Sequence, residues 1–202
     1  MKKLILLFAV AFNLNSNEFL TGSLVDYSGL IKMPNARFNN EGKVSFNYSR
    51  YDPYGKYVFQ FSPYDWFEGA LFYTDINSLG YPDFERGPGG MQSQKDKGFS
   101  LKARLFKEGE CYGLDYAFCE YLPNVAVGLV DFAGTSLTAS EYVVASKSFG
   151  RFDLTAGLGW GALGSTDNIG GNPLSILTDK FDQRGSGYSL GPVSYTHLTL
   201  PT

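Results

Sequence analysis

The sequence is poor in the residue types on which most catalytic and metal sites depend. Its 202 residues include one histidine, His197, and two cysteines. A lone histidine in the C-terminal tail offers little for acid–base catalysis or a Ser–His–Asp triad. Two thiols without partner ligands nearby do not predict a metal site. The sequence therefore predicts no cofactor and no metal, and it favours a protein that is not an enzyme.

Charged residues and long apolar runs are also scarce. Asp, Glu, Lys and Arg make up 18% of the chain, and the net charge of -3 gives no case for nucleic-acid binding. No segment has the roughly 18 consecutive apolar residues of a membrane-spanning helix. Lys2 and Lys3 precede the apolar run Leu4 to Val10, and Ala9-Val10-Ala11 matches a small-x-small cleavage pattern. This predicts a signal peptide over residues 1–17 and export from the cytoplasm.

Aromatic residues and glycine, in contrast, are abundant: 14 Tyr, 17 Phe and 24 Gly. Apolar and polar residues alternate from Phe99 to Phe106, and again from Phe152 to Trp160. Successive side chains of a strand point to opposite faces, so each segment has one apolar and one polar face. This is the pattern of a transmembrane β-barrel strand. A secreted β-sandwich, acting as an adhesin or binding module, shares this composition and stays open as an alternative.

Seven alternating segments predict an all-β fold. We expect an antiparallel up-and-down outer-membrane β-barrel, partial and of about seven or eight strands, over residues 43–192, preceded by a plug-like entry segment at 18–42. Because bacterial barrels have even strand numbers from eight upward, and open edges in lipid are very costly, an eighth strand or a longer native protein is implied. The predicted strands are 43–51, 57–62, 67–75, 99–106, 125–130, 141–149 and 151–160.

The connections predict the orientation of this barrel. The turns at residues 63–66 and 150–151 are short, as periplasmic turns usually are, whereas the loop at residues 76–98 is long and is expected outside. The last ten residues, 193–202, resemble a vector or adapter tail and are predicted to be non-native. The alternative is a short eighth strand, since this tail alternates weakly.

Polar residues on the predicted inner faces are candidate lumen-lining groups. Glu68, Asp153 and Glu141 are carboxylates on those faces, and paired carboxylates can hydrolyse glycosides. A network of charges lining the lumen is favoured over a polysaccharide-cleaving enzyme, because buried charges need partners. Rim aromatics are interpreted as an interfacial girdle rather than as a sugar-stacking surface. Cys111 and Cys119 are predicted to form a disulfide. The lumen-lining candidates are Asn47, Gln60, Glu68, Lys102, Arg104, Lys147 and Asp153.

Several short motifs, taken in order, resemble those of the YjbH family of exopolysaccharide and group 4 capsule outer-membrane proteins. They include Gly29-Leu30-Ile31-x-Met33-Pro34-Asn35-Ala36-Arg37, Asp131-x-x-Gly134-Thr135 and Gly157-Leu158-Gly159-Trp160-Gly161. The key motif residues are Gly29, Pro34, Arg37, Asp131, Gly134 and Trp160.

The resemblance implies an outer-membrane β-barrel in a Gram-negative bacterium that supports exopolysaccharide or capsule production or export. Its implied partners are outer-membrane lipid, polysaccharide and other polysaccharide-assembly proteins. Family members are longer and often described as lipoproteins, whereas here no cysteine directly follows the apolar run. A general outer-membrane porin or transporter is the alternative function.

Overall fold

The computed structural model describes residues 29–30, 33–80, 93–113, 119–134, 137–150, 152–164, 171–179, 181 and 193–199. The predicted signal peptide lies outside these described residues. Within them, no helix has the length and apolar character needed to span a membrane.

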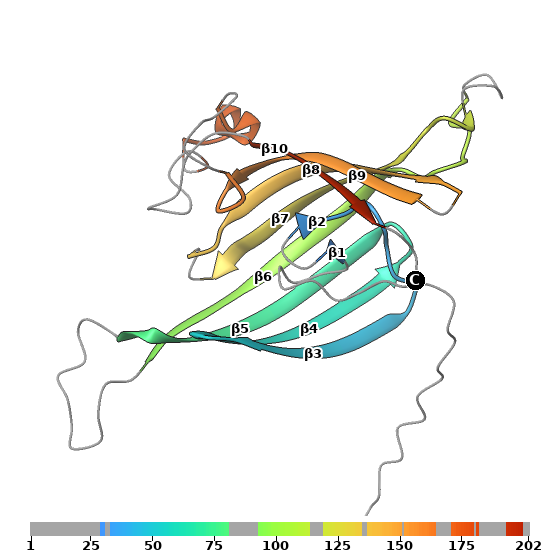
Figure 1. Ribbon diagram of the computed structural model, residues 1–202. Helices are drawn as coiled ribbons and strands as arrows, with labels where there is room; N and C mark the ends of the chain where they lie inside the picture. The colour runs from blue at the N-terminus through green and yellow to red at the C-terminus, as the bar shows by residue number, and fades with distance from the viewer. Residues whose placement is uncertain are drawn as a thin grey trace, which may run out of the picture.

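One antiparallel sheet dominates the fold. Its strands follow one another in chain order, each pairing with the next. Figure 1 shows the sheet bending into a half-barrel, with the small hairpin β1 (Gly29–Leu30) and β2 (Met33–Pro34) within its concave side. The strands are β3 (Lys43–Tyr51), β4 (Tyr54–Tyr64), β5 (Phe67–Gly80), β6 (Ser93–Phe106), β7 (Asn124–Gly134), β8 (Ser140–Phe149), β9 (Phe152–Gly161) and β10 (Val193–Thr199).

The predicted all-β class and seven alternating strands are confirmed as β3 to β9, but several strand ends differ, most of all in the hairpin of β5 and β6. The predicted bounds of the loop at residues 76–98 are wrong, because β5 continues to Gly80 and β6 already begins at Ser93. Polar cross-strand pairs extend the hairpin: Asp75 lies opposite Lys95, with an ion pair of 2.6 Å between Asp75 Oδ1 and Lys95 Nζ. Alternation of apolar side chains cannot reveal such a polar extension.

Residues 193–199 form β10, which pairs with β9 from Val193 opposite Gly159 to Thr199 opposite Asp153. This is the eighth strand that the sequence left open as an alternative. That residues 193–202 are non-native stays a prediction.

The register separates the sheet into two chemically different faces. We call the face against which β1 and β2 lie the concave face, and the opposite one the convex face. Most convex-facing side chains are apolar and many of them are exposed, whereas concave-facing polar side chains are mostly buried. The exposed convex set includes Val44, Phe46, Tyr48, Tyr57, Phe59, Leu71, Tyr73, Val143, Phe149, Phe152, Leu154 and Leu158; the buried concave polar set includes Lys56, Gln60, Ser62, Glu68, Thr74, Asp96, Ser100, Lys102, Ser146 and Thr155.

Residues 33–39, which we call the strap, account for the burial of the concave face. Ala36 and Phe38 of the strap join the apolar cluster built by Val58, Ala70, Phe72, Ala126, Val130, Tyr142 and Val144. Gly128 contributes by lacking a side chain, since a Cβ there would overlap the Tyr142 ring on the neighbouring strand. The core therefore lies between the strap and the sheet.

Candidate site on the concave face

A buried ion pair lies at the centre of the concave face. Glu68 on β5 and Lys102 on β6 are directly opposite residues, and Glu68 Oε2 lies 3.3 Å from Lys102 Nζ. Both side chains are fully buried. A buried pair is tolerated only if its remaining polar atoms also have partners, and the strap supplies them. The Asn39 N–H donates to Glu68 Oε1 at 2.6 Å, and Lys102 donates to the Arg37 carbonyl oxygen.

The strap also places an aromatic ring among these charges. The Phe38 ring centroid lies 4.4 Å from Lys102 Nζ and 4.5 Å from Arg104 Cζ. A cation over an aromatic face is attracted by the quadrupole of the ring. A further hydrogen bond of 2.9 Å runs from the Ala36 N–H to Ser146 Oγ. These contacts use the main chain of the strap and its one aromatic side chain.

Arg37 fixes the strap to three other segments. Its guanidinium donates to both carboxylate oxygens of Asp153 on β9, at 2.5 and 3.1 Å, and to Ser148 Oγ on β8 at 2.7 Å. A third partner is Glu108, which follows β6, with 2.6 Å between Arg37 Nη1 and Glu108 Oε2. Such fork-like contacts to carboxylates are the strongest hydrogen bonds that arginine makes.

The pKa values of this cluster follow from these contacts. Partial burial opposes the charge of Arg37, but hydrogen bonds to Asp153 and Glu108 outweigh it and raise the pKa of Arg37. Partial burial likewise opposes ionisation of Glu108, yet hydrogen bonds from Arg37 and Lys147 hold its pKa below the usual range. At neutral pH Arg37 and Glu108 therefore both carry their charges.

Replacing Arg37 with alanine is expected to destabilise the fold by about 2 kcal/mol. The expected loss is smaller than for a fully buried ion pair, because water screens these partly exposed charges. The change removes every guanidinium contact and leaves Glu108 and Asp153 without their shared cation. Denaturant unfolding in detergent micelles measures the loss. Arg37→Lys is the matched control: it keeps the charge but not the fork, so we expect an intermediate loss. Equal stability of the alanine variant and the native chain would contradict a structural role for these contacts.

The lumen-lining candidates divide between the two faces. Asn47, Gln60, Glu68, Lys102, Arg104 and Asp153 have concave register positions. Lys147 differs from the prediction: it lies opposite convex-facing Leu154, and its ammonium reaches past the end of the sheet to Glu108 Oε1 at 3.1 Å and the Glu120 carbonyl oxygen at 2.5 Å. The alternation of β8 places Ser146, not Lys147, on the concave face.

Glu141 also differs from its predicted inner position. It lies opposite Leu129 and Trp160, which belong to the convex side. Its burial has another cause: Asn172 donates to Glu141 Oε2 at 2.8 Å, just before the short 3-10 helix η1 (Pro173–Ile176). Trp160 Nε1 donates to the Gly171 carbonyl oxygen at 3.0 Å. These two side chains therefore anchor the segment after β9 to the end of the sheet.

The Asp131 and Gly134 motif marks a bulge where β7 pairs with β6. Asp131 is fully buried with a φ of 49°, its N–H donates to Ser100 Oγ, and its Oδ2 accepts the Thr138 N–H at 3.1 Å. A Cβ on Gly134 would overlap the Lys97 carbonyl oxygen, so the close strand approach requires glycine. The motif residues Gly29 and Pro34 lie in the buried β1–β2 hairpin.

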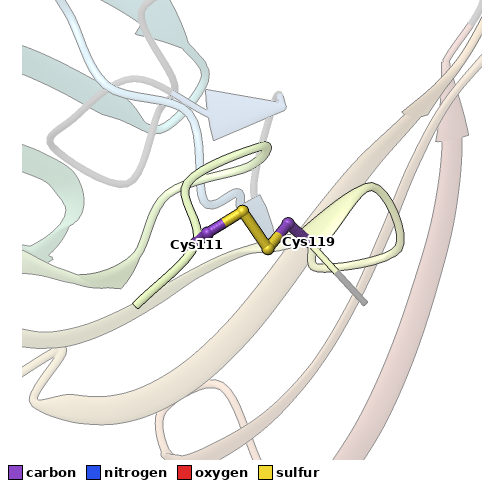
Figure 2. The surroundings of a disulfide bond; sticks show 2 residues. All are labelled: Cys111 and Cys119. Atoms are coloured by element: carbon purple, nitrogen blue, oxygen red, sulfur yellow. A yellow bond between two sulfur atoms is a disulfide. The ribbon is translucent and has the colours of Figure 1, made fainter. Parts of the chain in front are cut away.

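Cys111 and Cys119 are joined by a disulfide in the connection between β6 and β7 (Figure 2). Their Cα atoms are 5.1 Å apart. Lys147 holds the same connection to β8 through the Glu120 carbonyl oxygen. This connection lies at the end of the sheet that also carries Glu108.

Two carboxylates at concave register positions, Glu68 and Asp153, are both engaged in ion pairs. Glu68 is occupied by Lys102 and the Asn39 N–H, and Asp153 by Arg37. Throughout the described ranges, no group of three or more His, Cys, Asp or Glu residues is placed to bind a metal ion. What the site does is bind a polypeptide segment against a polar sheet face.

Sequence reasoning missed several partners of this site. Ser146 could have been found, because it falls on the concave side of the β8 alternation. Glu108 lies outside any strand, and Asn39 acts through its main chain, so neither carries a signal in the sequence. Asn172 caps η1 through its own side chain, a local pattern that gives no hint of Glu141.

The comparisons with known proteins agree with the motifs on this face. A family model described as "Exopolysaccharide biosynthesis protein YbjH" matches residues 23–198. The protein named "Uncharacterized lipoprotein YjbH" from Escherichia coli (strain K12) is 42% identical over 160 residues, which cover 79% of this chain and 21% of that relative. The chain thus spans about a fifth of the length of the curated relative it matches. No solved structure matches. With its strap motif and its sheet both inside the matched range, the chain belongs to the YjbH family of exopolysaccharide biosynthesis proteins.

Proposed function

We propose that this chain forms part of the wall of an outer-membrane β-barrel that supports production or export of exopolysaccharide or capsule, without catalysing a step itself. The observation that carries the proposal is the contrast between its two faces. A water-soluble sheet exposes its polar face and buries its apolar one. This sheet exposes the apolar convex face and buries Glu68 and Lys102 on the concave one. Transmembrane barrels have this distribution.

The aromatic residues of the convex face support a membrane location. Tyr48, Tyr57 and Tyr73 lie together toward one end, with ring centroids of Tyr48 and Tyr57 4.7 Å apart. Tyr64 and Trp66 stack at the other end, with their ring centroids 5.7 Å apart and an angle of 5° between the ring planes. Tyr57 and Tyr64 are seven residues apart on β4, so the two groups are separated by about 23 Å along the strand. This is comparable with the apolar band of about 25 Å between aromatic girdles.

A single β-sandwich explains the convex face less well. In a sandwich a second sheet would cover the apolar side. The second sheet in the described part of the chain is the β1–β2 hairpin, and it lies on the polar side instead.

The strap then acts as a plug. It lies where the lumen of a closed barrel would be and contacts the sheet through Glu68, Lys102 and Ser146. Its charged and hydroxyl partners are groups that remain well solvated if water or polymer replaces the strap. A polymer moving through such a barrel would pass along these polar groups. The end of the sheet bearing the Asp65–Trp66 turn and the disulfide is proposed to face the periplasm.

Fluorescence of the two tryptophans tests the membrane location. Trp66 is 50% exposed beside the convex face, whereas Trp160 is 7% exposed and bonded to Gly171. In vesicles with bromine-labelled acyl chains, we expect Trp66 emission, measured in a Trp160→Phe variant, to be strongly quenched. Emission of Trp160 in a Trp66→Phe variant should change little. Equal, weak quenching of both would contradict contact between the convex face and lipid.

Deletion of the gene in its source bacterium tests the biological role. We expect secreted or capsular polysaccharide to fall and the native gene to restore it. Assay of total uronic acid and hexose in washed cells and medium measures the change. Unchanged polysaccharide, together with reduced uptake of small solutes, would instead favour a general porin.

A further inference from the structure

The strand β3 ends the described sheet, yet most of its length lacks the features that protect a natural sheet edge. Free edges are usually blocked by proline, a bulge, inward-pointing charges or a short strand, because unpaired main-chain groups otherwise recruit other strands. β3 is nine residues long, contains no proline, and pairs with β4 without a register shift. Its charged residues, Lys43 and Arg50, lie near its two ends, and only Lys43 is on the concave face, where it donates to Asn39 Oδ1. The stretch 44–49 between them carries no charge.

The side chains of β3 are patterned for an interior position. Val44 and Phe46 continue the convex apolar face, and at 60% and 66% they are more exposed than any other apolar side chain of the described sheet. On the concave side, Asn47 of β3 is exposed, whereas Gln60 on the neighbouring strand β4 is buried. Within the described sheet, β3 therefore lacks on one side the neighbouring strand that every interior strand has.

We propose that the free edge of β3 is a pairing site for a further antiparallel strand of the same polypeptide. The inference rests on the proposed barrel, in which an unpaired edge in lipid leaves main-chain groups unsatisfied. The occupant follows from the length of the relative: four-fifths of it lie outside the matched stretch. The added strand would place apolar residues beside Val44 and Phe46 and polar residues beside Asn47, because paired residues share a face.

Hydrogen exchange of main-chain amides tests this inference on the natural gene product, read from source DNA through the codons after residue 192 and expressed at full length. In a strand, alternate amides point to opposite sides, so half of those in β3 face the free edge. If a strand occupies this edge, the amides of β3 should exchange as slowly as those of β5, which is paired on both sides. In the 202-residue chain the edge-facing amides should exchange at least about 100-fold faster than those of β5.

Three outcomes would overturn the inference. One is a reading frame that ends at residue 202. Another is fast exchange of the edge-facing amides in the full-length protein while β5 stays protected. The third is protection of β3 in the 202-residue chain that grows with protein concentration, which would identify a second copy as the occupant. Because strand pairing protects main-chain amides with or without lipid, protected β3 amides without quenching of Trp66 would refute the membrane location and leave the pairing intact.

Discussion

Glu68→Leu is expected to destabilise the fold by about 3–5 kcal/mol, one of the largest effects of any single substitution in this chain. The variant removes the carboxylate that faces Lys102 and leaves a fully buried ammonium without its opposite charge. It also removes the acceptor of the Asn39 N–H, so the strap loses one of its main-chain contacts. Denaturant unfolding in detergent micelles, followed by circular dichroism, measures the loss.

The double variant Glu68→Leu with Lys102→Met separates charge burial from lost volume. Replacing both members of a buried pair with apolar residues of similar size is often near neutral, so the double variant should recover much of the stability lost in Glu68→Leu. It should not recover all of it, because the Asn39 N–H and the Arg37 carbonyl oxygen each lose a partner. A double variant less stable than Glu68→Leu alone would show that the pair is not buried by the strap.

Most strands of this fold could be predicted because apolar and polar residues alternate along them, as they do in β9. Phe152, Leu154 and Leu158 share the convex face, and Asp153 and Thr155 the concave one. The ends of the strands depend on cross-strand contacts instead. The Asp75–Lys95 ion pair lies where β6 extends beyond its predicted start, and β4 begins at Tyr54, whose ring centroid lies 5.1 Å from that of Tyr51 on β3. Such cross-strand contacts form only once the register is set.

The concave site was predictable in part for the same reason. Alternation identified Glu68, Lys102 and Asp153 as facing one side, but it could not indicate what covers them. Residues 33–39 have no periodic pattern, and their contacts to Glu68 and Ser146 use main-chain atoms that every residue possesses. For Glu141, polarity suggested the wrong face, because a carboxylate can also be buried by a neighbour such as Asn172. Register, rather than polarity, decides the face of a strand residue.

Leu71→Arg is expected to destabilise the protein in lipid by about 2–4 kcal/mol, the cost of a cation near the bilayer midplane on the outer face of a barrel. Leu71 lies midway along the part of β5 that pairs with β4, and its side chain is 51% exposed on the convex face. Denaturant unfolding from phospholipid vesicles measures the change. In water the same substitution would cost little, since exposed surface positions usually tolerate change within about 0.5 kcal/mol.

Asn47→Arg is the matched control for this last prediction, because it introduces the same side chain at an exposed position on the opposite, concave face. A charge directed toward a water-filled lumen should leave stability nearly unchanged, so the two variants should differ by at least about 2 kcal/mol in vesicles. The difference arises from the surrounding medium and not from the arginine itself, and it should therefore vanish if the convex face meets water. Two variants of equal stability would show that the exposed apolar face of this sheet is not a lipid-facing surface.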